Sequence, residues 1–133
     1  MTTYKVDVTA FGTASGSRKV QTAVLDEIAA LVDSVPPDGG VIVVAALTSG
    51  VDHGNFYLFR NHSGLVHIML HEHREHFARD PCVQPIGGAV VFHGEDGEIF
   101  SVPATSTTSW ERGRAALLHW LPAQARWPEL IWE

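Results

Sequence analysis

The sequence feature that most constrains the fold is an unbroken apolar run, Val-Ile-Val-Val-Ala-Ala-Leu, at residues 41–47. β-Branched side chains fill its first four positions, and such residues favour extended backbone over helix. A strand with one exposed face alternates apolar and polar residues, so a strand without polar positions has both faces covered. The run therefore predicts an interior strand of a sheet. It is also far shorter than the roughly 20 residues of a bilayer span, so we expect no membrane partner.

Other segments show the two-residue period of strands with one buried face. Residues 4–10 alternate apolar with polar side chains, which predicts a strand at the start of the chain. Residues 56–59 and 65–70 are strongly apolar, and residues 60–64 between them have the composition of a hairpin loop. These segments together predict an antiparallel meander.

A further hairpin is predicted near residue 96. Residues 89–93 and 98–102 flank an Asp96-Gly97 pair, which favours the positive φ angles of a tight turn. The stretch before it, residues 74–88, contains two prolines and a glycine pair without a clear period. We therefore expect a long loop there.

Two segments have the spacing of amphipathic helices. In the first, the apolar residues are Val20, Val24, Ile28, Leu31, Val32 and Val35, and Pro36-Pro37 ends it. In the second, residues 108–111 (Thr-Ser-Trp-Glu) fit a capping box. Its apolar face is Gly113, Ala116, Leu117, Trp120 and Leu121, and Pro122 ends it.

These elements predict one α+β domain over residues 1–133. Its core would be a mainly antiparallel sheet of five or six strands with two amphipathic helices. The apolar residues 130–132 are expected to pair or dock instead of fraying. A chain of this length commonly forms a single core.

The charge balance indicates which class of partner the protein is expected to bind. Nine Lys and Arg face fifteen Asp and Glu, for a formal net charge of −6, which argues against direct nucleic-acid binding. Glu95, Asp96 and Glu98 cluster on the predicted hairpin turn, where they could meet a basic partner. The lone Cys82 allows no internal disulfide, and the first residues do not resemble a secretory signal, so we expect a cytoplasmic location.

Four of the eight histidines, His67, His71, His73 and His76, lie within ten residues. On a strand, His67, His71 and His73 would share one face, which we expect to point outward. A His-x-His pair can offer two imidazoles to zinc, with His67, His62 or His93 as a third ligand. The cluster therefore has two interpretations, a partner-facing strand or the site of a metal-binding protein or metal-dependent enzyme.

No other catalytic pattern is complete in the sequence. The glycine-rich segments lack the Lys-Ser/Thr ending of a P-loop, and no serine occupies a Gly-x-Ser-x-Gly elbow. Cys82 has no orienting partner that the sequence identifies. We therefore expect a protein without catalytic residues, cofactor or resident metal.

The C-terminal third carries a resemblance to a known family. Residues 114–121 (Arg-Ala-Ala-Leu-Leu-His-Trp-Leu) and 125–132 (Ala-Arg-Trp-Pro-Glu-Leu-Ile-Trp) resemble the ending of the first-numbered family of bacterial polymorphic-toxin immunity proteins. The hairpin before them and the order of the elements are similar too. Trp127 stands between Arg126 and Pro128, where that family usually has Arg and Pro adjacent.

The resemblance implies a small α+β protein that binds a cognate toxin and blocks it without catalysis. Toxins of that family are often nucleic-acid deaminases. We hypothesise that Glu95, Asp96 and Glu98 attract the toxin over distance. The exposed face of the strand that carries His67, His71 and His73 would make the close contacts.

Overall fold

A computed structural model describes residues 1–82 and 87–133. The strands are β1 (Thr2–Ala10), β2 (Gly16–Thr22), β3 (Gly40–Thr48), β4 (Val51–Arg60), β5 (Leu65–Glu72), β6 (Arg74–Arg79), β7 (Ala89–His93), β8 (Ile99–Pro103), β9 (Thr108–Ser109) and β10 (Ile131–Trp132). The helices are α1 (Leu25–Asp33) and α2 (Trp110–Trp120), with short 3-10 helices η1 (Gly12–Ala14) and η2 (Ala104–Ser106).

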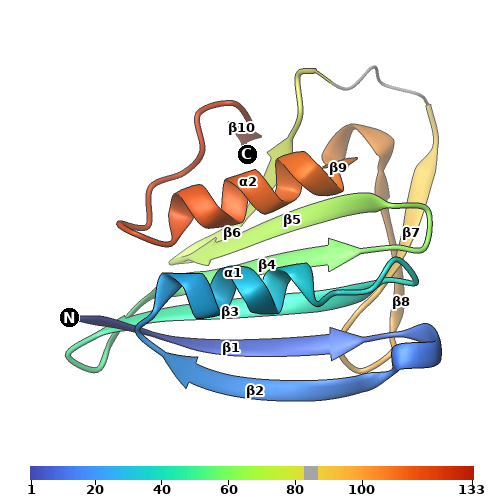
Figure 1. Ribbon diagram of the computed structural model, residues 1–133. Coiled ribbons are helices and arrows are strands. Elements are labelled where there is room, and N and C mark those ends of the chain that lie inside the picture. Colours follow the sequence, from blue (N-terminus) through green and yellow to red (C-terminus); the bar gives the residue numbers. More distant parts are fainter. Residues whose placement is uncertain (83–86) are drawn as a thin grey trace.

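Most strands form one antiparallel sheet in the order β10-β6-β5-β4-β3-β1-β2, and β9 pairs with β5. The strands β7 and β8 form a separate hairpin. Both helices lie on one side of the large sheet, and the β7–β8 hairpin crosses the other side (Figure 1). The predicted α+β class is confirmed, with more strands than the five or six expected.

The interior strand predicted from residues 41–47 is confirmed as β3, which pairs with β1 and β4. Ile42 and Val44 face the helices and are fully buried. Val41 faces the other side and is buried beneath the hairpin. Cover on both faces therefore explains the apolar side chains of Val41, Ile42 and Val44, whereas Val43 and Ala45 are only half-buried.

The main core lies between the sheet and the two helices. Helix α1 contributes Ile28, Leu31 and Val32, while α2 contributes its predicted face, with Trp120 fully buried. Gly113 lets α2 approach β5 closely, because a β-carbon there would lie 2.7 Å from Cγ1 of Val66. Figure 1 shows α1 and α2 side by side across the sheet.

The predicted first helix begins too early, because residues 16–22 form strand β2 instead. Val20 pairs with Val6 of β1 and packs against the main core from the sheet side. Helix α1 begins only at Leu25, after the Thr22 hydroxyl accepts a hydrogen bond from the Val24 amide. Val20 thus packs against the same core as the residues of α1, although it lies on a strand. Its four-residue spacing from Val24 matched the period of a helix, and the sequence therefore predicted a helix that includes it.

The long loop predicted for residues 74–88 is wrong in its first part. Residues 74–79 form β6, which pairs with β5 on one side and β10 on the other. In β6, buried and exposed side chains alternate, and His76 and Ala78 are the buried ones. Because His76 is polar, the sequence does not show this alternation. Residues 83–86 lie outside the described part of the chain. The expected pairing of the C-terminal residues is confirmed by β10.

The second helix is capped one residue later than the sequence indicates. The Ser109 hydroxyl accepts a hydrogen bond from the Arg112 amide, which makes Ser109 the N-cap. The Thr108 hydroxyl instead donates to the buried carboxylate of Asp80. No helix of the described residues has the length and apolar character needed to cross a membrane.

Candidate interaction surface

The side of the sheet opposite the helices is divided into a covered and an uncovered part. The β7–β8 hairpin covers one part through Phe92, which is 0% exposed and packs with Val41 and Phe59 in a second hydrophobic cluster. Phe100 on β8 lies 5.1 Å from Phe59 between ring centroids, in an edge-to-face arrangement. These aromatic contacts fix the hairpin on the sheet.

His67 lies beneath this hairpin and is only 3% exposed, so the prediction that it faces outward is wrong. Its ring centroid lies 5.6 Å from that of Phe77 and 5.8 Å from that of Phe92. The Nδ1 atom lies 2.9 Å from the carbonyl oxygen of Ser106, to which the neutral ring donates. His67 is therefore a packing residue that links β5 to the chain after the hairpin.

Burial lowers the pKa of His67, and the hydrogen bond to the Ser106 carbonyl opposes this effect without cancelling it. The folded protein thus favours the neutral ring, so stability is full above the ordinary histidine value of 6.5 and falls as the pH drops below it. We expect His67→Phe to remove part of this pH dependence. Urea unfolding between about pH 7.5 and 5 measures it, since histidine titrates in that range. An unchanged slope in the variant would contradict the prediction.

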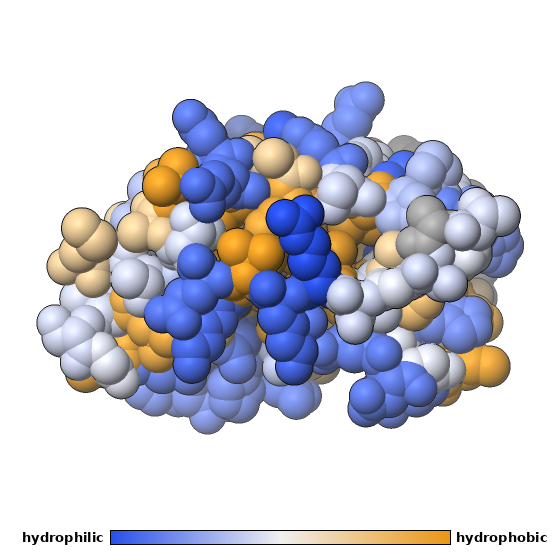
Figure 2. Space-filling view, turned by 60° about the horizontal axis from the view of Figure 1, so that its bottom comes forward, coloured by the Kyte–Doolittle hydropathy of each residue, from blue (hydrophilic) through white to orange (hydrophobic). Residues whose placement is uncertain are grey.

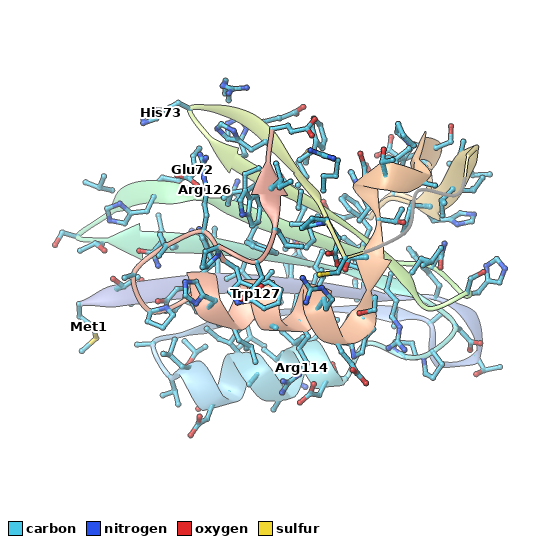
Figure 3. The ribbon with its side chains drawn as sticks, turned by 90° about the horizontal axis from the view of Figure 1, so that it is seen from above. Met1, Glu72, His73, Arg114, Arg126 and Trp127 are labelled. Carbon is cyan, nitrogen blue, oxygen red and sulfur yellow. The ribbon has the colours of Figure 1, made fainter. Side chains whose placement is uncertain are left out.

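The other histidines of the predicted cluster lie apart from His67. His71 is exposed on β5, and His73 occupies the tight turn into β6 with φ 62°. Figure 3 shows His73 at the periphery of the molecule. Both line a broad hollow of about 710 Å³ that also contains His53. Within residues 1–82 and 87–133, no three His, Cys, Asp or Glu side chains are placed to share a metal ion, so no geometry favours the metal alternative.

The predicted turn of the hairpin is confirmed, and its acidic residues are exposed. Glu95, Asp96 and Glu98 follow Gly94, whose amide donates to the Glu98 carbonyl oxygen at 2.8 Å. We call these three acidic residues the acidic tip. The hairpin crosses the sheet, so the acidic tip lies near β1 and β2. There Glu95 and Asp96 line a hollow of about 380 Å³ together with Asp7 of β1.

The acidic tip has a surplus of negative charge. Loss of contact with water raises the pKa of Glu95, and the carboxylates of Asp7 and Asp96 raise it further. The ammonium of Lys19 lies 3.9 Å from Asp7 and offsets part of this repulsion. A basic group of a partner would relieve the remaining repulsion.

The uncovered part of the sheet lies beside the hairpin, and we call it the open face. Its residues form two rows across the central strands. Val43, Tyr57 and Met69 form the row next to the hairpin and pack against the second hydrophobic cluster, while Lys5, Ala45, Asn55 and His71 form the row farther from it. The apolar members are half-buried. Part of this face forms a hollow of about 410 Å³ that extends to Lys19 and Gln21 of β2.

Most basic side chains are already paired with carboxylates, and one of them, Lys19, lies beside the acidic tip. Among residues 1–82 and 87–133, five ion pairs use five of the nine Lys and Arg residues and five of the fifteen acids. Figure 3 shows one of these pairs, Glu72 with Arg126. The side chains of Trp110, Trp127 and Trp132 are partly buried and pack against the main core. Glu95, Asp96 and Glu98 take part in none of these five ion pairs, so the acidic tip and the open face beside it form the candidate interaction surface.

The structure brings together only part of the residue set predicted for partner binding. The acidic tip and His71 lie on the side of the sheet opposite the helices, whereas His67 is buried. Asp7 was missed, although its alternation with Val6 and Val8 placed it on the polar side of β1. Its proximity to the tip depends on the path of a hairpin more than 80 residues away along the chain.

The resemblance to immunity proteins rests on residues that form α2, β10 and the segment between them, together with the β7–β8 hairpin. Neither a scan of the sequence against protein-family models nor a search of curated proteins found a match.

Proposed function

We propose that this protein is a non-catalytic inhibitor that binds a bacterial toxin, a nucleic-acid deaminase, through the open face and the acidic tip. The observation that carries the proposal is the position of the tip. The hairpin fixes three exposed carboxylates beside an uncovered, half-apolar sheet face. The resemblance of the C-terminal third to immunity proteins supplies the class of partner.

The charge of this surface suits such a partner. An enzyme that acts on a nucleic acid needs basic residues along the path of the phosphates and a pocket for the target base. The acidic tip can occupy that basic path, while the open face covers the surface around the pocket. Inhibition of the toxin then requires tight binding and a complementary shape, and it requires no catalytic residue.

The proposal is tested with the protein encoded by the reading frame next to the gene for this chain. We expect that protein to carry a deaminase-like zinc motif and to stop cell growth when expressed alone. Co-expression of this chain should restore growth, and the two purified proteins should form a stable complex. A toxic neighbour that this chain neither binds nor neutralises would contradict the proposal.

We expect the acidic tip to govern the rate of association. Neutralising it with Glu95→Gln, Asp96→Asn and Glu98→Gln should lower the association rate constant for the toxin about tenfold at low ionic strength. The slope of that rate constant against salt concentration should also flatten, because fewer charges steer the encounter. Stopped-flow or surface-based kinetics at several salt concentrations measures both effects.

A matched control removes the same number of charges from the helix side. Asp26, Glu111 and Glu129 are exposed and lie away from the hairpin. Their amide variants change the net charge equally, so we expect a much smaller loss of rate. Equal losses in the two triple variants would show that net charge matters and that the position of the tip does not.

A further inference from the structure

The β7–β8 hairpin has a second face, which points away from the sheet. Strand side chains alternate between faces, and the inner face packs on the sheet through Phe92 and Phe100. The outer hairpin face, as we call it, consists of five exposed residues: Ala89, Val91, Ile99, Ser101 and Pro103. His93 shares their parity, but its ring centroid lies 5.9 Å from that of Phe11, so we leave it out of this face.

Two aliphatic side chains dominate the outer hairpin face. Val91 is 50% exposed and Ile99 is 71% exposed. The solvated side of a strand is normally polar, and exposed positions of β2 and β6 carry charged residues such as Lys19, Glu75 and Arg79. Figure 2, which brings the β2 edge forward, shows long hydrophilic side chains lying over apolar surface. The outer hairpin face contains no charged residue, and this departure from the rule indicates contact with another molecule.

This apolar face continues directly into the acidic tip. Ile99 follows Glu98 in the chain, and Glu95 and Asp96 occupy the turn that joins the two strands. A molecule that covers Val91 and Ile99 therefore has the three carboxylates at the border of its contact. Charge complementarity favours Lys or Arg at that border. The occupant that fits is an apolar patch bordered by basic residues.

A second copy of this chain fits the outer hairpin face poorly. Stable interfaces use about 20–30 residues on each side, whereas a pairing of two such faces would use five from each copy. A second copy also has a net charge of −6 and would bring an acidic tip where a basic border is needed.

The shape of the surface narrows the partner further. The hairpin packs on the sheet, and packed sheets lie about 10 Å apart, so the outer hairpin face stands about that far above the open face. A protein that contacts both must have a surface with a matching step. A peptide or a small ligand would reach only one of the two levels.

We infer that the outer hairpin face binds an apolar patch of the partner protein that is bordered by Lys or Arg. This inference rests on the proposed function for the identity of the partner, and it adds a contact beyond the open face and the acidic tip. It also divides the work between neighbouring residues of one hairpin. The carboxylates of the tip accelerate the encounter, while Val91 and Ile99 slow dissociation.

The test is the double variant Val91→Thr with Ile99→Thr. Threonine keeps the β-branched shape and the strand preference, so the hairpin stays folded. The partner is the protein encoded by the neighbouring reading frame. We expect the dissociation rate constant of the complex to rise about tenfold, with the association rate constant and its salt dependence unchanged. The triple variant of the acidic tip should show mainly the opposite pattern, a slower association.

A matched control changes two exposed apolar residues on the helix side. Val24 is 49% exposed and Leu25 is 37% exposed, and both lie at the start of α1. Val24→Thr with Leu25→Thr should leave both rate constants unchanged.

A direct readout of contact uses methyl NMR signals and a soluble paramagnetic probe. In the free protein, the probe should broaden the methyl signals of Val91 and Ile99 as well as those of Val24 and Leu25. Binding of the partner should protect only the first two.

Unchanged dissociation of the double variant, or methyl groups of Val91 and Ile99 that stay accessible in the complex, would overturn the inference. The growth assay reports on the proposed function separately, and protection that persists in that case would leave the inhibitor function standing. A dimer of the free chain that the double variant abolishes would assign the face to a second copy and reject the inference. A neighbouring protein that is neither bound nor neutralised would reject the inference together with the proposed function.

Discussion

Replacing Arg112 with leucine is expected to lower the free energy of unfolding by about 3 kcal/mol or more, because it leaves a buried carboxylate without its cation. The side chain of Asp80 is 0% exposed. Its oxygens accept two hydrogen bonds from the Arg112 guanidinium, at 2.6 and 3.2 Å, and others from Thr108 and the Cys82 amide. This network ties the chain after β6 to α2. Urea unfolding at neutral pH measures the effect.

The same helix supplies a matched control. Arg114 also makes a two-bond contact with a carboxylate, at 2.6 and 3.0 Å, but its partner Asp33 is 50% exposed. Solvent screens such a pair, so Arg114→Leu should cost less than about 1 kcal/mol. The double variant Arg112→Leu with Asp80→Asn should recover part of the loss, because it removes the uncompensated charge. Equal effects of the two single Arg variants would contradict the role assigned to burial.

The pH dependence gives an independent check of this pair. Burial would raise the pKa of Asp80, but the hydrogen bonds from Arg112, Thr108 and the Cys82 amide outweigh it and lower the pKa below the ordinary 3.8. The stabilisation is therefore present above that value and disappears as the pH falls through the lower folded value. The difference between wild type and Arg112→Leu should shrink over the same range. A constant difference would exclude the ionised carboxylate as its cause.

The strands predicted correctly are those whose burial leaves a clear pattern of apolar side chains within a short stretch of sequence. In β3, Ile42 and Val44 face the main core and Val41 lies under the hairpin, so both faces of the strand carry apolar residues, and the sequence shows this directly. The β7–β8 hairpin follows from Asp96-Gly97, because Gly97 adopts the positive φ of 79° that the turn needs. These signals depend on residues within a few positions of one another.

The strands predicted incorrectly are at or near the sheet edges. In β2 most residues are exposed, so only Val20 carried information, and its spacing from the helix residues suggested a helix. In β6 the polar composition is tolerated because pairing with β5 and β10 supplies the stability. Weak local preference was overridden by pairing with distant strands, which a single sequence does not reveal.

The same distinction explains the candidate site. The acidic tip was predictable because three acids flank a recognisable turn. The burial of His67 was not, because it depends on where the hairpin docks, and the parity of β5 alone places His67, His71 and His73 on one face. That face is covered at His67 and open at His71. The position of one hairpin thus separates a packing histidine from a surface histidine.

Phe92→Ala is expected to have the second large effect, with a loss of about 3–5 kcal/mol in the free energy of unfolding. Phe92 is fully buried between the hairpin and the sheet, and its ring lies 6.0 Å from Phe100 and 5.8 Å from His67. Truncation removes the main contact that fixes the hairpin and leaves a cavity beneath it. Denaturant unfolding monitored by circular dichroism measures the loss.

Val91 offers a control on the same strand, because its side chain points outward and is 50% exposed. Val91→Ala should change stability by less than about 1 kcal/mol, as expected for an exposed position. The two variants also separate the stability of the hairpin from its charge, since both keep the acidic tip. Below its unfolding transition, Phe92→Ala should bind the toxin more slowly than Val91→Ala, because the tip is no longer fixed beside Asp7. Equal association rates in the two variants would mean that a mobile tip attracts the partner as well as a fixed one, and that the anchoring aromatic cluster serves stability alone.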